Sequence, residues 1–180
     1  MNPVFTLQYG EFSVANELQS KIKNCSVFIP ASAQEKGIEL LLYRNEDGLN
    51  RCVTIQVKMS RTYNYGNKDF ANTLWFNRFE PQSNADWFVL TGLHTAFPQN
   101  DNVKIADAQW NSMFLAFSYN EMVEFMESVR CKKDTSKPDK MFGFGFNNAE
   151  EVYQTRGYTE VRDMSKFLLK NRITEIENTF

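Results

Sequence analysis

The hydrophobic and polar positions of this chain repeat with two different periods, and each period predicts a type of element. A spacing of three to four residues predicts a helix over 10–23, because Val14, Leu18 and Ile22 then share one face. Strict alternation predicts a strand over 51–60 with one apolar face and one polar face. Short apolar runs bounded by turn residues predict further strands at 26–29, 37–43, 73–79, 87–93, 113–117 and 141–146. The last of these alternates Phe with Gly, which is typical of a strand or of a bulged edge.

Helix signals return in the second half of the chain. Ser118 followed by Glu121 has the spacing of a capping box, which predicts a helix that continues to residue 129. Gly157 is placed as a C-cap for a helix over 148–156. A final helix is predicted over 163–178. Segments rich in turn residues predict loops at 64–72, 94–107 and 131–140.

The order of these elements predicts an α/β or α+β fold with one mixed central sheet flanked by helices. Asp-Gly at the centre of 45–50 predicts that the strands over 37–43 and 51–60 form an antiparallel hairpin. The continuous apolar run over 87–93 predicts a central strand. A length of 180 residues fits a single domain over 1–180.

The composition of the chain limits the cellular environment and the binding partners that are expected for it. The chain is 42% hydrophobic and contains 16 Phe, which supports an aromatic core. Its net charge of −2 gives no general signal for nucleic-acid binding, so a nucleic-acid partner would need a local basic patch. The lysines of 131–140 are candidates for such a patch, although the simpler interpretation is a solvated loop. No secretory signal and no apolar stretch of membrane-spanning length is visible, so a cytoplasmic protein without membrane contact is expected. Three widely spaced cysteines are expected to be buried free thiols.

The strand over 51–60 carries the most informative polar residues. Gln56 and Lys58 are two positions apart, so they project from the same side of the strand. If Glu39 faces the same way from the neighbouring strand, a carboxylate, an amide and an ammonium group meet at one place. These are the groups needed to hold a divalent metal ion against a phosphate.

Three segments together resemble a known family: Gly10–Leu18 (GEFSVANEL), Gly37–Leu41 (GIELL) and Ile55–Arg61 (IQVKMSR). Their order and residue types resemble the PD-(D/E)XK nuclease superfamily, which includes restriction endonucleases and archaeal Holliday-junction resolvases, in a variant with Gln-x-Lys in place of acidic-x-Lys. The resemblance covers residues 9–61. It implies a restriction-endonuclease-like core over 9–95, with 96–180 as an elaboration of the same domain.

The resemblance also implies the roles of the site residues in a Mg²⁺-dependent endonuclease. Glu39 would be the principal metal ligand, and the Gln56 side-chain oxygen or the Val57 carbonyl would be a second. Glu11 would reach the site from the first helix, directly or through water. Lys58 would stabilise the developing negative charge or orient the attacking water. Mn²⁺ is a further candidate ion, because it tolerates looser geometry.

The implied substrate is nucleic acid, DNA rather than RNA, with Ser60 and Arg61 as phosphate contacts. A homodimer is expected, because two nicks in a duplex need two sites. Two alternatives remain open. In the first alternative the chain is a catalytically degenerate member of the superfamily that binds nucleic acid or protein. Two residues suggest this alternative: Glu39 stands in place of the usual Asp, and Gln56 adds no negative charge. The second alternative is an interaction protein whose aromatic-rich C-terminal half contacts a partner.

Overall fold

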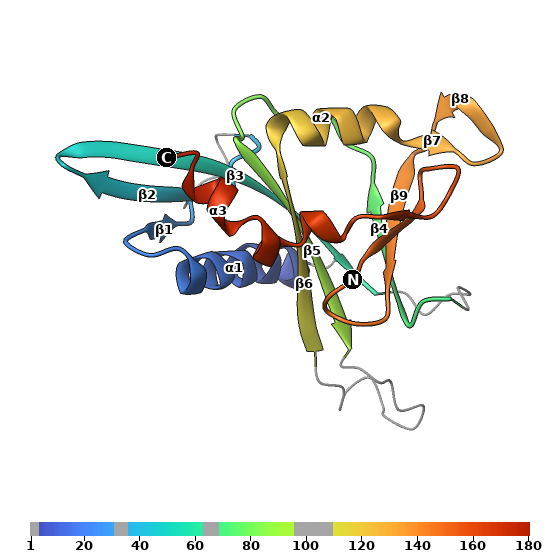
Figure 1. Cartoon of the computed structure of the whole chain (residues 1–180), viewed down its shortest axis with the longest axis horizontal. Helices are drawn as coiled ribbons and strands as arrows, with labels where there is room; N and C mark the ends of the chain where they lie inside the picture. Colours follow the sequence, from blue (N-terminus) through green and yellow to red (C-terminus); the bar gives the residue numbers. More distant parts are fainter. Residues whose placement is uncertain (1–3, 31–35, 63–68, 96–109) are drawn as a thin grey trace.

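A five-stranded mixed sheet forms the centre of the fold (Figure 1). The structure is a computed structural model and describes residues 4–30, 36–62, 69–95 and 110–180. In spatial order the strands are β1 Ser26–Phe28, β2 Leu40–Glu46, β3 Leu49–Arg61, β5 Trp87–Thr95 and β6 Trp110–Ser118. Neighbouring strands are antiparallel except β3 and β5, which are parallel. The predicted mixed central sheet is therefore confirmed, and the content of helix and strand fits the α+β class.

A two-residue turn joins β2 to β3. Asp47 and Gly48 have φ angles of 52° and 80°, both in the left-handed region that a type I′ turn requires. The predicted antiparallel hairpin is confirmed, but its first strand is shifted three residues toward the turn and its second strand is longer than predicted, because the tight turn lets pairing continue to Glu46 and Leu49. The far end of the hairpin is exposed and projects from the body of the molecule (Figure 1).

Strand β5 is buried on both faces, as its continuous apolar run predicted. Trp87 and Val89 belong to the apolar cluster on one side of the sheet, and Phe88 and Leu90 belong to the cluster on the other side. Successive side chains of a strand point to opposite faces, so both faces of β5 must be covered by other elements.

Helix α1 Val4–Lys21 covers one face of the sheet (Figure 1). Val14 and Leu18 are fully buried there, with Ile22 just beyond the helix end. The C-terminal helix α3 Ile173–Glu177 contributes Ile176 to the same cluster. The predicted helix is confirmed in its apolar face, although it begins six residues before the predicted start at residue 10.

A second, four-stranded antiparallel sheet lies against the opposite face, which the sequence did not predict. Its strands, in spatial order, are β11 Arg162–Asp163, β10 Tyr153–Arg156, β9 Met141–Phe146 and β4 Asn72–Asn77. The two sheets approach closely where Gly92 of β5 faces β4: a Cβ atom on Gly92 would lie 2.1 Å from Cδ1 of Leu74. Only glycine leaves room for this contact.

The Phe-Gly alternation of β9 follows from this packing. Its three phenylalanines are fully buried in the core between the sheets. On the other face, a Cβ atom on Gly143 would lie 2.7 Å from the Trp75 side chain, and one on Gly145 would lie 2.5 Å from the Phe70 ring. Strand β9 pairs with β4 on one side and β10 on the other, so the segment is an interior strand and its reading as a bulged edge is wrong.

The helix predicted over 148–156 is wrong, because this segment turns and then forms β10. The Asn148 side chain accepts hydrogen bonds from the backbone N–H groups of Glu150 and Glu151, at 2.8 Å and 3.0 Å, which resembles a helix start. The chain leaves this turn to pair with β9, and Gln154 is fully buried there. Pairing with the preceding strand thus outweighs a local turn signal.

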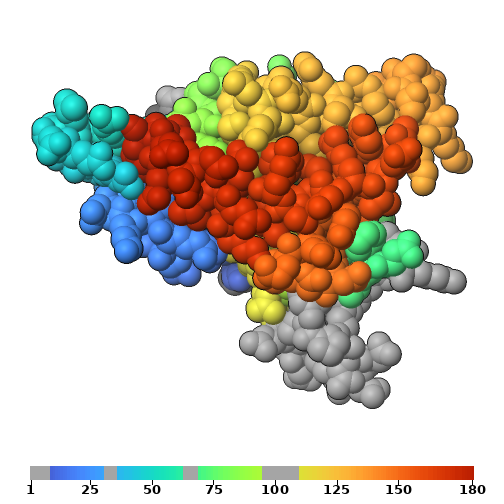
Figure 2. All heavy atoms as spheres, viewed as in Figure 1, coloured from blue at the N-terminus to red at the C-terminus, as the bar shows by residue number. Residues whose placement is uncertain are grey.

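Two further C-terminal predictions are corrected. The segment 131–140 contains a small ribbon, β7 Arg130–Cys131 with β8 Asp134–Pro138, in place of a loop. The segment 163–178 is broken into the end of β11, two 3₁₀ turns (η2 Ser165–Phe167 and η3 Leu169–Asn171) and α3, in place of one helix. Figure 2 shows the chain after β9 crossing one face of the molecule as a continuous band below α2 Tyr119–Ser128.

Helix α2 begins with the predicted capping box: Ser118 accepts from the Glu121 backbone, and the Glu121 carboxylate accepts from the Ser118 N–H at 2.9 Å. Most of the predicted loops 64–72 and 94–107 lies outside the described residues, although His94 continues β5. All three cysteines are free thiols, but only Cys25 is buried as expected, whereas Cys131 is partly buried and Cys52 is exposed. Within the described ranges no helix is long and apolar enough to cross a membrane.

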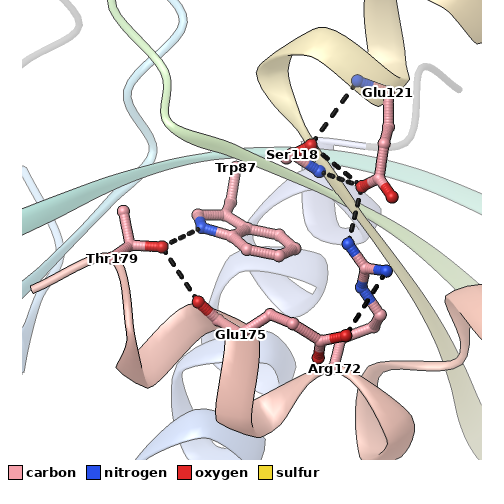
Figure 3. Close-up of polar contacts among 6 residues, drawn as sticks. All are labelled: Trp87, Ser118, Glu121, Arg172, Glu175 and Thr179. Carbon is pink, nitrogen blue, oxygen red and sulfur yellow. Dashed lines mark hydrogen bonds and ion pairs between the residues drawn. The ribbon is translucent and has the colours of Figure 1, made fainter.

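Arg172 links the C-terminal segment to the central sheet (Figure 3). Its guanidinium lies 2.6 Å from the Glu121 carboxylate and 3.7 Å from that of Glu175. It also lies 5.2 Å from the centre of the Trp87 ring, whose indole N–H donates to Thr179 at 3.0 Å. A single cation therefore joins the start of α2, the strand β5 and the last helix.

Candidate active site beside the start of β2

The candidate site lies at the edge of β3, just past the point where β2 stops pairing with it. Lys58 Nζ is 3.8 Å from Glu39 Oε1, and the two side chains are 34% and 25% exposed. Glu39 and Lys58 therefore face each other as an ion pair that solvent reaches. The predicted proximity of these two residues is confirmed, and their roles in catalysis remain a prediction.

The separation of β2 from β3 explains how Glu39 reaches this position. The first ladder pair between the strands is Leu40 with Ile55, and Glu39 donates its own N–H to Ile55 O at 3.0 Å. Past this pair, the Glu39 side chain takes the place of a strand partner: Oε2 accepts the N–H of Val57 at 2.9 Å. The Val57 carbonyl points to the same side of β3 as this N–H, past the end of the ladder. The carbonyl predicted as a metal ligand thus faces the gap beside β3.

Gln56 lies behind this pair, on the same face of β3 as Lys58 because their positions differ by two. It is only 4% exposed, and its Oε1 atom has no hydrogen-bond partner among the described residues. Gly37, with a φ of +88°, passes over the Gln56 amide: a Cβ atom on Gly37 would lie 3.0 Å from Nε2. A buried amide oxygen without a partner costs free energy, so its retention needs an explanation.

Helix α1 brings a second carboxylate to the cluster. Gly10 packs directly on β3, where a Cβ atom would lie 3.0 Å from Met59. The next residue, Glu11, lies near enough to Glu39 and Lys58 for both to affect it electrostatically. Burial raises the pKa of the Glu11 carboxyl above its ordinary value, the negative charge of Glu39 raises it further, and Lys58 lowers it.

An aromatic ring supports the ammonium group. Lys58 Nζ lies 5.6 Å from the centre of the Phe79 ring, which itself stacks on Phe88 in the core at 6.1 Å. Nothing in the sequence pattern indicated a role for Phe79, which follows β4. Gly37 was visible only as the residue that opens a predicted strand.

The two predicted phosphate contacts are placed differently. Ser60 donates its hydroxyl to the Trp75 carbonyl at 2.6 Å, so it links β3 to β4. Arg61 is exposed at the last position of β3. The structure therefore brings Glu39, Lys58 and Glu11 together, sets Gln56 and Val57 beside them, and directs Ser60 to a structural contact.

The side chains of the site can be compared with the ligands that a divalent cation requires. In the described part of the chain no three His, Cys, Asp or Glu side chains are placed to hold one metal ion. The oxygen donors here are the Glu39 and Glu11 carboxylates and the Val57 carbonyl, and Gln56 adds a buried amide oxygen that has no partner among the described residues. Mg²⁺ binds hard oxygen ligands, retains several waters and needs only one or two carboxylates. The donor set suits Mg²⁺ or Mn²⁺ and does not suit zinc, which prefers nitrogen and sulfur.

Comparison with known proteins adds no relative. The chain matches no protein-family model, no curated protein and no solved structure. A function for the site is therefore inferred from its contacts alone.

Proposed function

We propose that this protein is a metal-dependent nuclease-like enzyme that cleaves phosphodiester bonds of nucleic acid, DNA in preference to RNA. The observation that carries the proposal is the ion pair of Glu39 and Lys58 at 3.8 Å, with Glu11 near enough for both to affect its pKa. Gln56, whose amide oxygen has no partner among the described residues, lies on the same face of β3 as Lys58. The restriction-endonuclease-like character of the core over 9–95 is part of the same proposal.

In this proposal Glu39, Glu11, the Gln56 oxygen and the Val57 carbonyl hold the cation. When bound, a divalent cation polarises the phosphate and lowers the pKa of an attacking water. Burial raises the pKa of Glu11 most and the charge of Glu39 raises it further, and a cation bound near both carboxylates would offset these two effects.

Lys58 is the residue proposed to act on the scissile phosphate. Its ammonium group lies 3.8 Å from Glu39 and 5.6 Å from the centre of the Phe79 ring, and these contacts favour one orientation before substrate arrives. A preorganised cation stabilises the negative charge that develops on the phosphate oxygens in the transition state. Because the Lys58 side chain is still partly exposed, a phosphate group can approach it from solvent.

One observation favours the alternative of a degenerate binding module. Both Glu39 oxygens already have partners, the Val57 N–H and the Lys58 ammonium group. A carboxylate satisfied by the protein itself can persist without a metal. In that case the same surface binds nucleic acid or protein and cleaves nothing.

The test is a cleavage assay on duplex, branched and single-stranded DNA and on RNA, with Mg²⁺, Mn²⁺ or EDTA. Wild type is compared with Lys58→Met and with Lys21→Met as a matched control, since Lys21 pairs with Glu17 on the exposed side of α1. Metal-dependent cleavage that falls at least about a hundredfold in Lys58→Met and is unchanged in Lys21→Met supports the enzyme.

Cleavage that survives Lys58→Met unchanged contradicts the proposed role of this site. If no substrate form is cleaved but nucleic acid binds, and the binding weakens in Lys58→Met, the degenerate binding module is the better description. Metal titration by calorimetry in the same samples separates a site that binds no cation from one that binds it without cleavage.

A further inference from the structure

A hollow of about 550 Å³ lies between α2 and the C-terminal segment, away from the site described above. In Figure 2 these two elements lie side by side on the visible face. The hollow is lined by one stripe of α2 and by residues that follow β10: Glu121, Glu124, Phe125, Ser128, Arg162, Asp163, Met164, Lys166 and Phe167. Its size is that of a site for a small organic molecule.

Arg162 is held in one orientation at this hollow. Its Nε–H donates to the Gln154 side-chain oxygen at 2.6 Å, and Nη2 donates to Ser128 Oγ at 3.1 Å. Gln154 is fully buried, so it is a fixed acceptor. The guanidinium also lies 4.3 Å from the centre of the Tyr158 ring and 5.5 Å from that of Phe125. Two hydrogen bonds and two rings thus preorganise this side chain.

The remaining donors of Arg162 have no counter-ion. Among the described residues no carboxylate oxygen lies within 4.0 Å of its nitrogens, in contrast to Arg44, Arg156 and Arg172. The two bonds above use the Nε–Nη2 edge of the guanidinium, which leaves the Nη1–Nη2 end for a bidentate partner. Burial lowers the pKa of Arg162, as expected for a cation that is partly withdrawn from water.

The acidic residues of the hollow decide which anion fits. Glu121 is engaged by Arg172 and by Ser118, and Asp163 accepts from the Ser165 hydroxyl and N–H. Glu124 and Lys166 are exposed, so their opposite charges are well solvated. Three carboxylates around one hollow disfavour a dianion such as a phosphate monoester, whereas a monoanion is repelled less.

We propose that this hollow binds a small organic carboxylate, with its carboxylate group on the free end of the Arg162 guanidinium and its apolar body against Phe125, Met164 and Phe167. The two N–H groups at that end match the two oxygens of a carboxylate. Phe125, Met164 and Phe167 are at most 9% exposed, so they add only a small apolar contact and the Arg162 guanidinium provides the main interaction. The site is independent of the proposed nuclease activity.

The probe is 3-phenylpropionate, which combines a carboxylate with an aromatic body. Binding to the full chain is measured by calorimetry and by NMR shifts of the Arg162 Nε–H, beside two matched probes: the neutral amide 3-phenylpropionamide and the dianion phenyl phosphate. Saturable binding of the carboxylate, at least about tenfold tighter than that of the amide and of phenyl phosphate, is expected. This comparison needs no variant, so it does not depend on the folding of one.

A second arm uses Arg162→Gln, with Arg51→Gln as a control at an exposed arginine of the distal hairpin. Loss of affinity of at least about tenfold in the first variant and none in the second is expected, provided that thermal unfolding shows both to be folded. Three results overturn the proposal: no saturable binding at about 10 mM probe, equal affinity for the amide, or tighter binding of phenyl phosphate. Unchanged affinity in a folded Arg162→Gln variant overturns it as well.

Discussion

The Glu39 carboxylate accepts the backbone N–H of Val57 at 2.9 Å, where β2 no longer runs beside β3. A strand that loses its neighbour exposes polar backbone groups, and a side chain here satisfies one of them. The bond also holds the Glu39 carboxylate next to Lys58. One carboxylate thus serves the fold and the candidate site, and variants can separate the two contributions.

The Glu39–Lys58 ion pair is expected to contribute little to stability. A double-mutant cycle of Glu39→Gln and Lys58→Met in chemical denaturation should give a coupling free energy below about 1 kcal/mol, because both side chains are partly exposed. Glu39→Ala should cost about 1–2 kcal/mol, since it also removes the acceptor of the Val57 N–H. A coupling of several kcal/mol would instead make the pair a structural element.

Replacing Glu11 should change how stability depends on pH. A carboxyl whose pKa is raised in the folded state makes folding less favourable as pH rises above its ordinary value of 4.5, because the folded state holds the proton more tightly. Glu11→Gln should therefore gain stability over wild type near pH 7 and lose that advantage near pH 4, as measured by urea denaturation across this range. Glu17→Gln on the exposed side of α1 is the control. Mg²⁺ or Mn²⁺ should reduce the advantage if Glu11 contacts the cation, and an advantage that is independent of pH would contradict the interpretation.

Exchange of the Gln56 amide tests the cation site directly. Gln56→Glu should bind Mn²⁺ about tenfold more tightly, because it adds a negative ligand, and should be less stable than wild type without metal, because it buries a charge. Gln56→Leu should weaken metal binding without loss of stability, since the oxygen that it removes has no partner in the described part of the chain. Calorimetric titration and thermal unfolding with and without Mn²⁺ measure both effects. Asn77→Asp is the control for an added exposed charge, and equal metal affinity in all four proteins would exclude Gln56 as a ligand.

Arg172 should be the most sensitive charged residue of the C-terminal segment (Figure 3). Arg172→Met keeps an apolar contact with Trp87 but leaves Glu121 without its cation, so it should cost about 3 kcal/mol. The expected fall in Tm is about 10 °C for a chain of this size. Adding Glu121→Gln should recover part of the loss, because the unpaired charge is removed with its partner. A fall in the free energy of unfolding below about 1 kcal/mol would show that apolar packing alone holds the C-terminal segment on the sheet.

Elements with a strong local signal were predictable from the sequence. Asp47-Gly48 determines a tight hairpin because few other residue pairs adopt two successive positive φ angles. Ser118 and Glu121 determine the start of α2 because both halves of the capping box lie within one helical turn. The two-sided apolar run from Trp87 indicated an interior strand before its neighbours were known.

The C-terminal third was predicted poorly because its conformation depends on distant partners. Asn148 forms a turn that resembles a helix start, yet Gln154 is buried in β10 opposite β9. Leu168 forms an isolated bridge with Leu115 of β6, which interrupts the segment predicted as a helix. No local pattern encodes a pairing partner some 50 residues away.

For the candidate site, the sequence alone determined that Gln56 and Lys58 share a face, because alternation within one strand is a local property. Only the tertiary structure decided that Glu39 turns toward Lys58, because that depends on where β2 parts from β3. The same holds for Glu11, which reaches the cluster because Gly10 lets α1 pack against Met59. The hollow beside Arg162 had no sequence signal at all, since its two walls meet only through long-range packing of the C-terminal segment on α2.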